Sequence, residues 1–307
     1  MNAAIVTGAT GFIGRAVIQK LIDNDIKVLA ICRNFHSPHI IENELVQYVK
    51  CDVNEINSLI EKVSINYYDT FYNFAWAGVD TTLRCDFDTQ LKNVKLSLNC
   101  LRVAKQIGCK RFIGVGSIME REIIDATLMN GVKPSKSYTY GASKFYAHMI
   151  SLIEAAQINI DFIWAEITNA YGVGENSTRL INTTLKKIIK NEKLEFTDGK
   201  QNYDFIYIDD AAKAFYLIGK YGKPFKRYVI GSYNPRPLRE YLLDIKEHIA
   251  PDKKFEFGKI KYTGLSLPLS SFYSEDLKKD TGFKPEVDFN IGVERTYNWL
   301  KNNYDRG

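Results

Sequence analysis

The chain's first candidates for chemistry are a tyrosine and a lysine four residues apart, Tyr140 and Lys144. A helix would place both on one face, and a nearby ammonium favours the phenolate, which would lower the pKa of the phenol towards that of a general acid or base. Tyr216 and Lys220 have the same spacing. Only the first pair follows a predicted strand that ends in a hydroxyl, Ser117. We therefore predict Ser117, Tyr140 and Lys144 as catalytic residues, and the second pair as a surface pair.

Three glycines, Gly8, Gly11 and Gly14, lie between a predicted strand at Ala3–Thr7 and a predicted helix at 15–23. Glycine in such a turn lets the backbone approach a pyrophosphate, and the helix N-terminus offers unpaired N–H groups. The pattern predicts a dinucleotide-binding loop, with an ordinary strand-to-helix turn as the alternative. The predicted loop contacts are Gly8, Thr10, Gly11, Phe12, Ile13 and Gly14.

The end of the second predicted strand, Lys27–Cys32, indicates which dinucleotide is bound. An acid about 20 residues after the glycines would hold the ribose hydroxyl of NAD, whereas an arginine suits the 2′-phosphate of NADP. Here the strand is followed by Arg33 and Asn34. We predict NADP with Arg33 as a cofactor-binding residue; in the alternative, NAD is bound and Arg33 is a solvated surface residue.

Strand and helix patterns alternate over the first half of the chain, which predicts an α/β fold with a Rossmann-type, doubly wound parallel sheet. We expect residues 1–168 to form the NAD(P)-binding domain and 203–219 to return to it. Residues 169–202 and 220–307 would form a smaller α/β part that binds the substrate. The predicted strands are 3–7, 27–32, 46–51, 70–74, 111–116 and 161–166, and the main predicted helices are 15–23, 86–107, 138–157, 178–191, 238–249 and 291–301.

Composition narrows the class of protein. The 307 residues carry a net charge of +5, which is too mild for a nucleic-acid-binding protein and compatible with an anionic small molecule. The five cysteines form no CxxC pair and the four histidines no zinc motif. We therefore expect reduced thiols, a cytoplasmic location and no metal. No apolar run has the length of a membrane helix.

Several further motifs follow one another along nearly the whole chain. They are TGATGFIG (7–14), CDV (51–53), NFAWAG (73–78), GVGSIME (114–120), YGASK (140–144), ITNAYG (167–172) and DFIYIDDAAKAF (204–215). With these motifs the sequence resembles the extended short-chain dehydrogenase/reductase family, in its branch of nucleotide-sugar epimerases, dehydratases and reductases. The resemblance implies an NAD(P)-dependent enzyme that acts on a nucleotide sugar.

The resemblance also assigns cofactor contacts. Asp52, with Val53 beside it, would contact the adenine, and Ala75 and Trp76 would line the phosphates and ribose. A loop cap at Asp52 and a packed small residue at Ala75 are the structural alternatives.

Further roles follow from the same resemblance. Ser117 would hydrogen-bond the reacting oxygen, and Tyr140 would give or take its proton. Lys144 would bind the nicotinamide ribose and hold down the pKa of the tyrosine, while Asn169 would face the nucleotide of the substrate.

The residues after Ser117 help to choose among members of the branch. Dehydratases carry an Asp–Glu pair there, but this chain has Ile118 and Met119, which cannot transfer a proton. Arg33 favours a reductase, as does FEFGKIKY (255–262), which is similar to the CDP-abequose type of 4-keto-sugar reductase. We predict reduction of a nucleotide-linked 4-keto-6-deoxy sugar. An NAD-dependent nucleotide-sugar epimerase is the alternative, and a non-catalytic NAD(P)-binding protein is a third.

Two positions depart from the family pattern. Arginines that bind the substrate's diphosphate are replaced by Tyr203 and Thr263. We expect Arg179, Lys200 or Arg236 to substitute, and we predict Arg179 and Arg236 as substrate-binding residues. Otherwise the substrate is not a standard nucleoside diphosphate sugar.

The resemblance implies a homodimer formed through the helices near 86–107 and 140–157. We expect no nucleic-acid or membrane partner. The charged segment between Ser117 and Tyr138 predicts either a lid over the substrate or a solvated, helix-bearing excursion.

Overall fold

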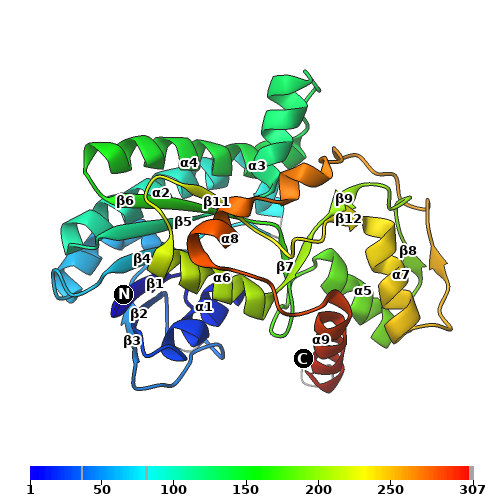
Figure 1. Ribbon diagram of the computed structural model, residues 1–307, viewed down its shortest axis with the longest axis horizontal. Coiled ribbons are helices and arrows are strands. Elements are labelled where there is room, and N and C mark those ends of the chain that lie inside the picture. Colours follow the sequence, from blue (N-terminus) through cyan, green and yellow to red (C-terminus); the bar gives the residue numbers. More distant parts are fainter. Residues whose placement is uncertain (36, 80–81, 304–307) are drawn as a thin grey trace.

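A seven-stranded parallel sheet forms the centre of the computed structural model, which describes residues 1–35, 37–79 and 82–303 (Figure 1). The strand order is β11-β6-β5-β4-β1-β2-β3. The inner strands are apolar runs buried on both faces, as a sheet covered by helices on both sides requires. The strands are β1 (Ala3–Thr7), β2 (Lys27–Cys32), β3 (Val46–Lys50), β4 (Thr70–Asn73), β5 (Arg111–Ser117), β6 (Asp161–Ile167) and β11 (Arg227–Ile230).

Helices cover both faces of this sheet (Figure 1). On one face α1 packs against α6, which also contacts α8; on the other α2 packs against α4 and the 3-10 segment η1. The expected Rossmann-type, doubly wound fold is confirmed. The elements are α1 (Phe12–Ile22), α6 (Ile208–Tyr221), α8 (Glu275–Thr281), α2 (Phe87–Ile107), α4 (Thr139–Gln157) and η1 (Val53–Lys62).

A smaller part, with a separate apolar core, lies at the carboxyl ends of the strands. Its short strands pair as β7 with β10, β9 with β12 and β8 with β13. The helices are α5 (Leu180–Ile189), α7 (Leu238–Ile249) and α9 (Phe289–Asn303). The strands are β7 (Asn169–Tyr171), β8 (Leu194–Glu195), β9 (Asn202–Tyr203), β10 (Phe205–Tyr207), β12 (Arg236–Pro237) and β13 (Phe255–Glu256).

One strand differs from the expected organisation. Strand β11 falls in the stretch assigned to substrate binding, yet it pairs with β6 and forms one edge of the central sheet. The division of the chain into a cofactor-binding and a substrate-binding part stays a prediction, except that residues 227–230 belong to the central sheet. None of the helices in the described ranges is long and apolar enough to span a membrane.

The segment after β5 is helical. It contains α3 (Met119–Glu122), a π-helical stretch at Ile123–Met129 and a 3-10 turn at Lys136–Tyr138, and it projects beside α4 (Figure 1). The helix-bearing excursion is therefore the observed structure, and movement as a lid stays a prediction.

Candidate active site

A cavity of about 1160 Å³ lies at the carboxyl ends of β1, β4 and β5, beside the smaller part. Open α/β sheets bind their ligands at this edge. Every residue predicted for the site except Arg236 lines this cavity. The lining members are Gly8, Thr10, Gly11, Phe12, Ile13, Gly14, Arg33, Asp52, Val53, Ala75, Trp76, Ser117, Tyr140, Lys144, Asn169 and Arg179.

The glycine loop leaves no space for side chains. Gly8 has a φ of 66°, and a Cβ there would lie 2.8 Å from the carbonyl carbon of Phe74. A Cβ on Gly14 would lie 2.3 Å from the carbonyl oxygen of Gly8. Gly11 is the N-cap of α1 and no side chain caps that end, so the loop fits a pyrophosphate whose oxygens accept the first N–H groups of the helix.

The residues predicted to contact the adenosine end of a dinucleotide lie on the cavity wall. Arg33 is exposed and lines the cavity. The Asp52 carboxylate accepts the backbone N–H of Asn54 at 2.9 Å and caps η1, while also lining the cavity. The Ala75 N–H donates to the Thr7 hydroxyl at 3.3 Å. The cap at Asp52 and the cofactor contact are therefore compatible.

Lys144 is buried beside the other residues predicted to be catalytic. Its Nζ donates to the Val115 carbonyl at 2.7 Å and lies 3.7 Å from the centre of the Trp76 ring. The Trp76 indole is fixed by donating to Gln90 Oε1 at 2.9 Å. Burial lowers the pKa of Lys144 to about 7, and the Glu120 carboxylate opposes that shift.

Tyr140, in the first turn of α4, and Ser117, at the end of β5, both line the cavity. Burial raises the pKa of Tyr140, against the opposing effects of Arg179, Arg84 and the Ser117 hydroxyl. Our expectation that the pKa of this phenol is lowered is wrong, because burial of the ring outweighs the neighbouring charges. Burial of the phenol therefore favours its protonated form.

The predicted substrate residues divide into two groups. Asn169 and Arg179 line the cavity; the Asn169 amide donates to the Asp204 carbonyl at 3.1 Å. Arg236 does not line it, since its guanidinium is ion-paired with Asp244 and stacks on a tyrosine ring of α7. The structure therefore gives no support to Arg236 as a substrate-binding residue. Lys200 is exposed and also lies outside the cavity wall.

The two departures from the family pattern lie on the cavity wall. Tyr203 and Thr263 both line it, and the Tyr203 ring stacks on Phe205 with centres 5.4 Å apart. This part of the wall is therefore aromatic and neutral where the resemblance places cations.

The cavity wall also contains residues that no sequence pattern predicted, among them Arg84 and Glu122. The Arg84 guanidinium lies 4.8 Å over the Tyr140 ring, and no motif surrounds it in the sequence. Glu122 also lines the cavity, and burial raises its pKa to about 7 against the opposing charge of Arg84. Glu122 follows Met119 by about one helical turn, which places both residues on one face of α3. This spacing is the sequence pattern from which Glu122 could have been predicted to line the cavity.

The second tyrosine–lysine pair lies outside this cavity. Lys220 is exposed and donates to the Tyr216 hydroxyl at 3.2 Å. The Tyr216 ring, however, is buried in the core beneath α6, so the expectation of a surface pair holds only for the lysine.

Known proteins are similar to this chain in sequence or in fold. The CDP-abequose synthase of Salmonella typhimurium is 24% identical over 94% of this chain and 95% of that protein. A putative UDP-glucose 4-epimerase of Methanocaldococcus jannaschii is 24% identical over 97% of this chain and 98% of that protein. The solved UDP-glucose 4-epimerase of Thermotoga maritima has a TM-score of 0.80 at 18% identity, covering 99% of this chain and 100% of that one.

A sequence model of one family matches most of the chain, at residues 4–231, a range that includes the glycine loop and the predicted catalytic residues. Its description is "NAD dependent epimerase/dehydratase family". The chain therefore belongs to the NAD dependent epimerase/dehydratase family of enzymes.

Proposed function

We propose that this enzyme reduces the keto group of a nucleotide-linked 4-keto-6-deoxy sugar with NADPH. The observation that carries the proposal is the Tyr140 phenol, which shares the cavity of the glycine loop with Ser117 and whose pKa is raised by burial. A ketone that becomes an alcohol needs a proton donor at its oxygen, and a protonated phenol is one. Ser117 would hold that oxygen by a hydrogen bond.

The cofactor would be held by this chain's own loop and cations. Gly8, Gly11 and Gly14 supply backbone room for the pyrophosphate, and Arg33 supplies a cation for the 2′-phosphate. Lys144 would bind the nicotinamide ribose. When bound, NADPH supplies the hydride.

A 4,6-dehydratase is not favoured, because both positions that would carry its acid pair are apolar. Ile118 and Met119 line the cavity next to Ser117, and neither side chain can take or give a proton.

Arg84 and Arg179 are our candidates for the cations that bind the substrate's phosphates. Both line the cavity, and both guanidinium groups act on the Tyr140 phenol. Arginine recognises phosphate oxygens with two parallel hydrogen bonds, which suits a diphosphate beside the reacting sugar.

The test measures whether the purified protein retains a bound cofactor and whether it oxidises NADPH with a nucleotide sugar. We expect purified protein to be free of tightly bound NAD and to oxidise NADPH, measured by absorbance, with at least one 4-keto nucleotide sugar. Co-purified NAD together with interconversion of two sugar epimers would establish the alternative, an epimerase. Inactivity with every nucleotide sugar would move the substrate out of that class.

A homodimer through α2 and α4 is also part of the proposal. The two helices pack side by side and expose large apolar side chains. These are Phe87, Leu91, Tyr146, Met149 and Ile153. Analytical ultracentrifugation should give a dimer for the wild type and a monomer for Ile153→Glu.

A further inference from the structure

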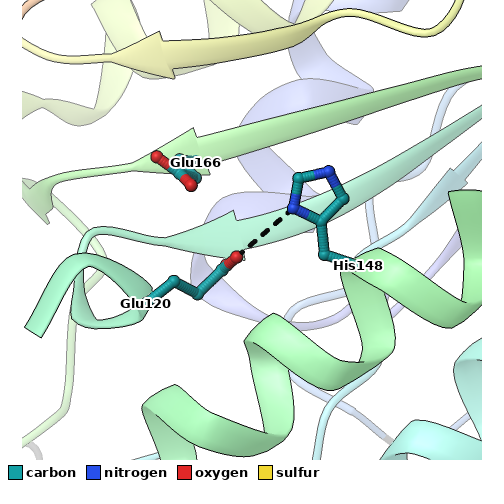
Figure 2. Close-up of side chains that lie close together, drawn as sticks. All are labelled: Glu120, His148 and Glu166. Carbon is teal, nitrogen blue, oxygen red and sulfur yellow. Dashed lines mark ion pairs between the residues drawn. The ribbon is translucent and has the colours of Figure 1, made fainter. Parts of the chain in front are cut away.

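A cluster of titratable side chains near the predicted catalytic residues is buried in the protein interior. Glu120 from α3, His148 from α4 and Glu166 from β6 have ligand atoms within 4.8 Å of one another (Figure 2). Glu120 is 0% exposed, and none of these three side chains lines the active-site cavity. The cluster is therefore part of the interior packing and offers no surface to a ligand.

Glycines in β5 make room for this cluster. A Cβ on Gly116 would lie 2.6 Å from Glu120 Oε1, and one on Gly114 would lie 2.4 Å from the Trp164 ring. Glu120 Oε1 accepts the backbone N–H of Ser117 at 2.8 Å and the indole N–H of Trp164 at 3.1 Å. Side chains thus fill the space that the glycines leave.

Arg15 on α1, in contrast, lies on the cavity wall and connects three segments of the chain. Its backbone N–H donates to the carbonyl oxygen of Gly11 at 3.0 Å, which ties it to the glycine loop. Its guanidinium donates to the carbonyl oxygen of Gly174 at 2.9 Å and contacts His39 Nδ1 at 2.8 Å. Arg15, His39 and Gly174 all line the cavity. One residue therefore joins the glycine loop, the β2–β3 connection and the segment after β7.

The two side-chain contacts fix the direction of the Arg15 guanidinium. A guanidinium can only donate, so His39 Nδ1 must accept and the imidazole is neutral. Burial and the charge of Arg15 lower the pKa of His39, which agrees with the neutral form. Gly174 has a φ of 88°, and a Cβ there would lie 2.3 Å from Arg15 Nη2. The guanidinium therefore approaches the backbone at a position where only a glycine leaves room.

The segment after β7 ends at Arg179, the N-cap of α5. Within it, the Glu175 N–H donates to the carbonyl oxygen of Gly172 at 3.2 Å. The Glu175 carboxylate accepts from the Ser177 hydroxyl at 2.6 Å and lies 3.9 Å from Arg179 Nε. The Arg179 N–H in turn donates to the Ser177 hydroxyl at 3.2 Å. Residues 172–179 therefore form one hydrogen-bonded unit, the 172–179 loop.

We propose that Arg15 is a positioning residue that holds the 172–179 loop, and with it the Arg179 guanidinium, next to the glycine loop. The proposal rests on the role proposed above for Arg179 as a cation for the substrate's phosphates. Loss of the Arg15 guanidinium would remove the contact between α1 and Gly174, so Arg179 would occupy its place in the cavity for a smaller fraction of the time. Arg15 would thereby connect the dinucleotide site with the site of the substrate's phosphates.

The first test measures hydrogen–deuterium exchange of the 172–179 loop by mass spectrometry. Arg15→Met keeps most of the aliphatic part of the side chain and removes the guanidinium. We expect the amides of the loop to exchange roughly 10-fold faster or more in this variant, the size expected for loss of a charged hydrogen bond. Arg295→Met, which removes an arginine paired with an acid of α6 outside the cavity wall, is the matched control and should leave the rates unchanged.

Unchanged exchange in folded Arg15→Met protein overturns the proposal. If that variant does not fold, two substitutions at His39 take its place. His39→Leu removes the acceptor that orients Arg15 and should speed exchange of the loop, whereas His39→Asn keeps an acceptor near the position of Nδ1 and should restore the wild-type rate. Equal rates in these two variants overturn the proposal.

The second test measures the affinity for a nucleoside diphosphate by calorimetry, with CDP and UDP as probes and NADPH saturating. Arg15→Met should weaken binding by about 3-fold or more. In Arg179→Gln protein the same substitution should cause no further loss, because both residues act through one contact. A loss of equal size in both backgrounds overturns the action of Arg15 through Arg179. If no nucleotide sugar is reduced, the exchange rates still decide the role of Arg15, and only the proposed reaction fails.

Discussion

The ammonium nitrogen of Lys144 lies 3.7 Å from the centre of the Trp76 ring. A cation over an indole face is attracted by the ring's quadrupole, so this contact favours the charged form of the lysine. We expect Trp76→Leu to lower the pKa of Lys144 below its value of about 7. The affinity for NADPH, measured by fluorescence across pH, should then begin to fall at a lower pH than in the wild type. Trp299→Leu, which removes an indole from α9, is the control and should leave the curve in place.

Tyr140→Phe keeps the aromatic ring against Trp76 and removes the proton donor. We expect kcat to fall by roughly 10²–10⁴-fold, the usual contribution of a positioned acid, while the Kd for NADPH changes little. Stopped-flow reduction and fluorescence binding measure the two quantities. Full activity of this variant would remove Tyr140 from the mechanism.

Arg33→Ala tests the choice of dinucleotide. A charged hydrogen bond contributes about 1.5–3 kcal/mol, so loss of the guanidinium should weaken NADPH binding by roughly 10–100-fold. The affinity for NADH should stay the same, because NADH has no 2′-phosphate. Equal losses for both cofactors would assign Arg33 a structural role instead.

Arg84→Gln should raise KM for the nucleotide sugar by about 10-fold or more, since it would remove the charge-assisted phosphate contact that we propose for Arg84. The KM for the cofactor should not change. Lys200→Gln is the matched control: it removes an exposed cation outside the cavity wall and should alter neither constant.

Glu122 makes stability depend on pH in a defined direction. Burial raises its pKa from 4.5 to about 7, so the folded protein binds this proton more tightly than the unfolded chain does. The free energy of unfolding therefore decreases between these two pH values and stays lower above them. Glu122→Gln should raise stability at pH 8 by ~1–3 kcal/mol and have little effect at pH 4. Denaturant unfolding at both pH values checks this, with exposed Glu247→Gln as the control.

A strand of the sheet could be predicted where its own sequence is enough to identify it. β1 and β2 have the predicted bounds, because both are uninterrupted apolar runs next to a glycine turn or a helix. β11 was missed. It has only four residues, and its partner β6 precedes it by some sixty positions, so its place in the sheet depends on tertiary pairing.

The residues of the site could likewise be predicted only where a local sequence pattern identifies them. The glycine loop and the Tyr140–Lys144 pair are local patterns, and the structure brings both to one cavity. Arg84 and Glu122 reach the cavity only through the folding of segments that carry no motif. The direction of the Tyr140 pKa shift also depends on desolvation, which residue spacing does not report.

Gly114 and Gly116 have a consequence for how this sequence can diverge. The space that their missing side chains leave is occupied by the Trp164 ring and by Glu120. A larger residue at Gly114 requires a smaller one at position 164, and a larger residue at Gly116 requires changes at both positions 164 and 120. These positions are therefore coupled epistatically: they can be exchanged as a set between related enzymes, but not one at a time.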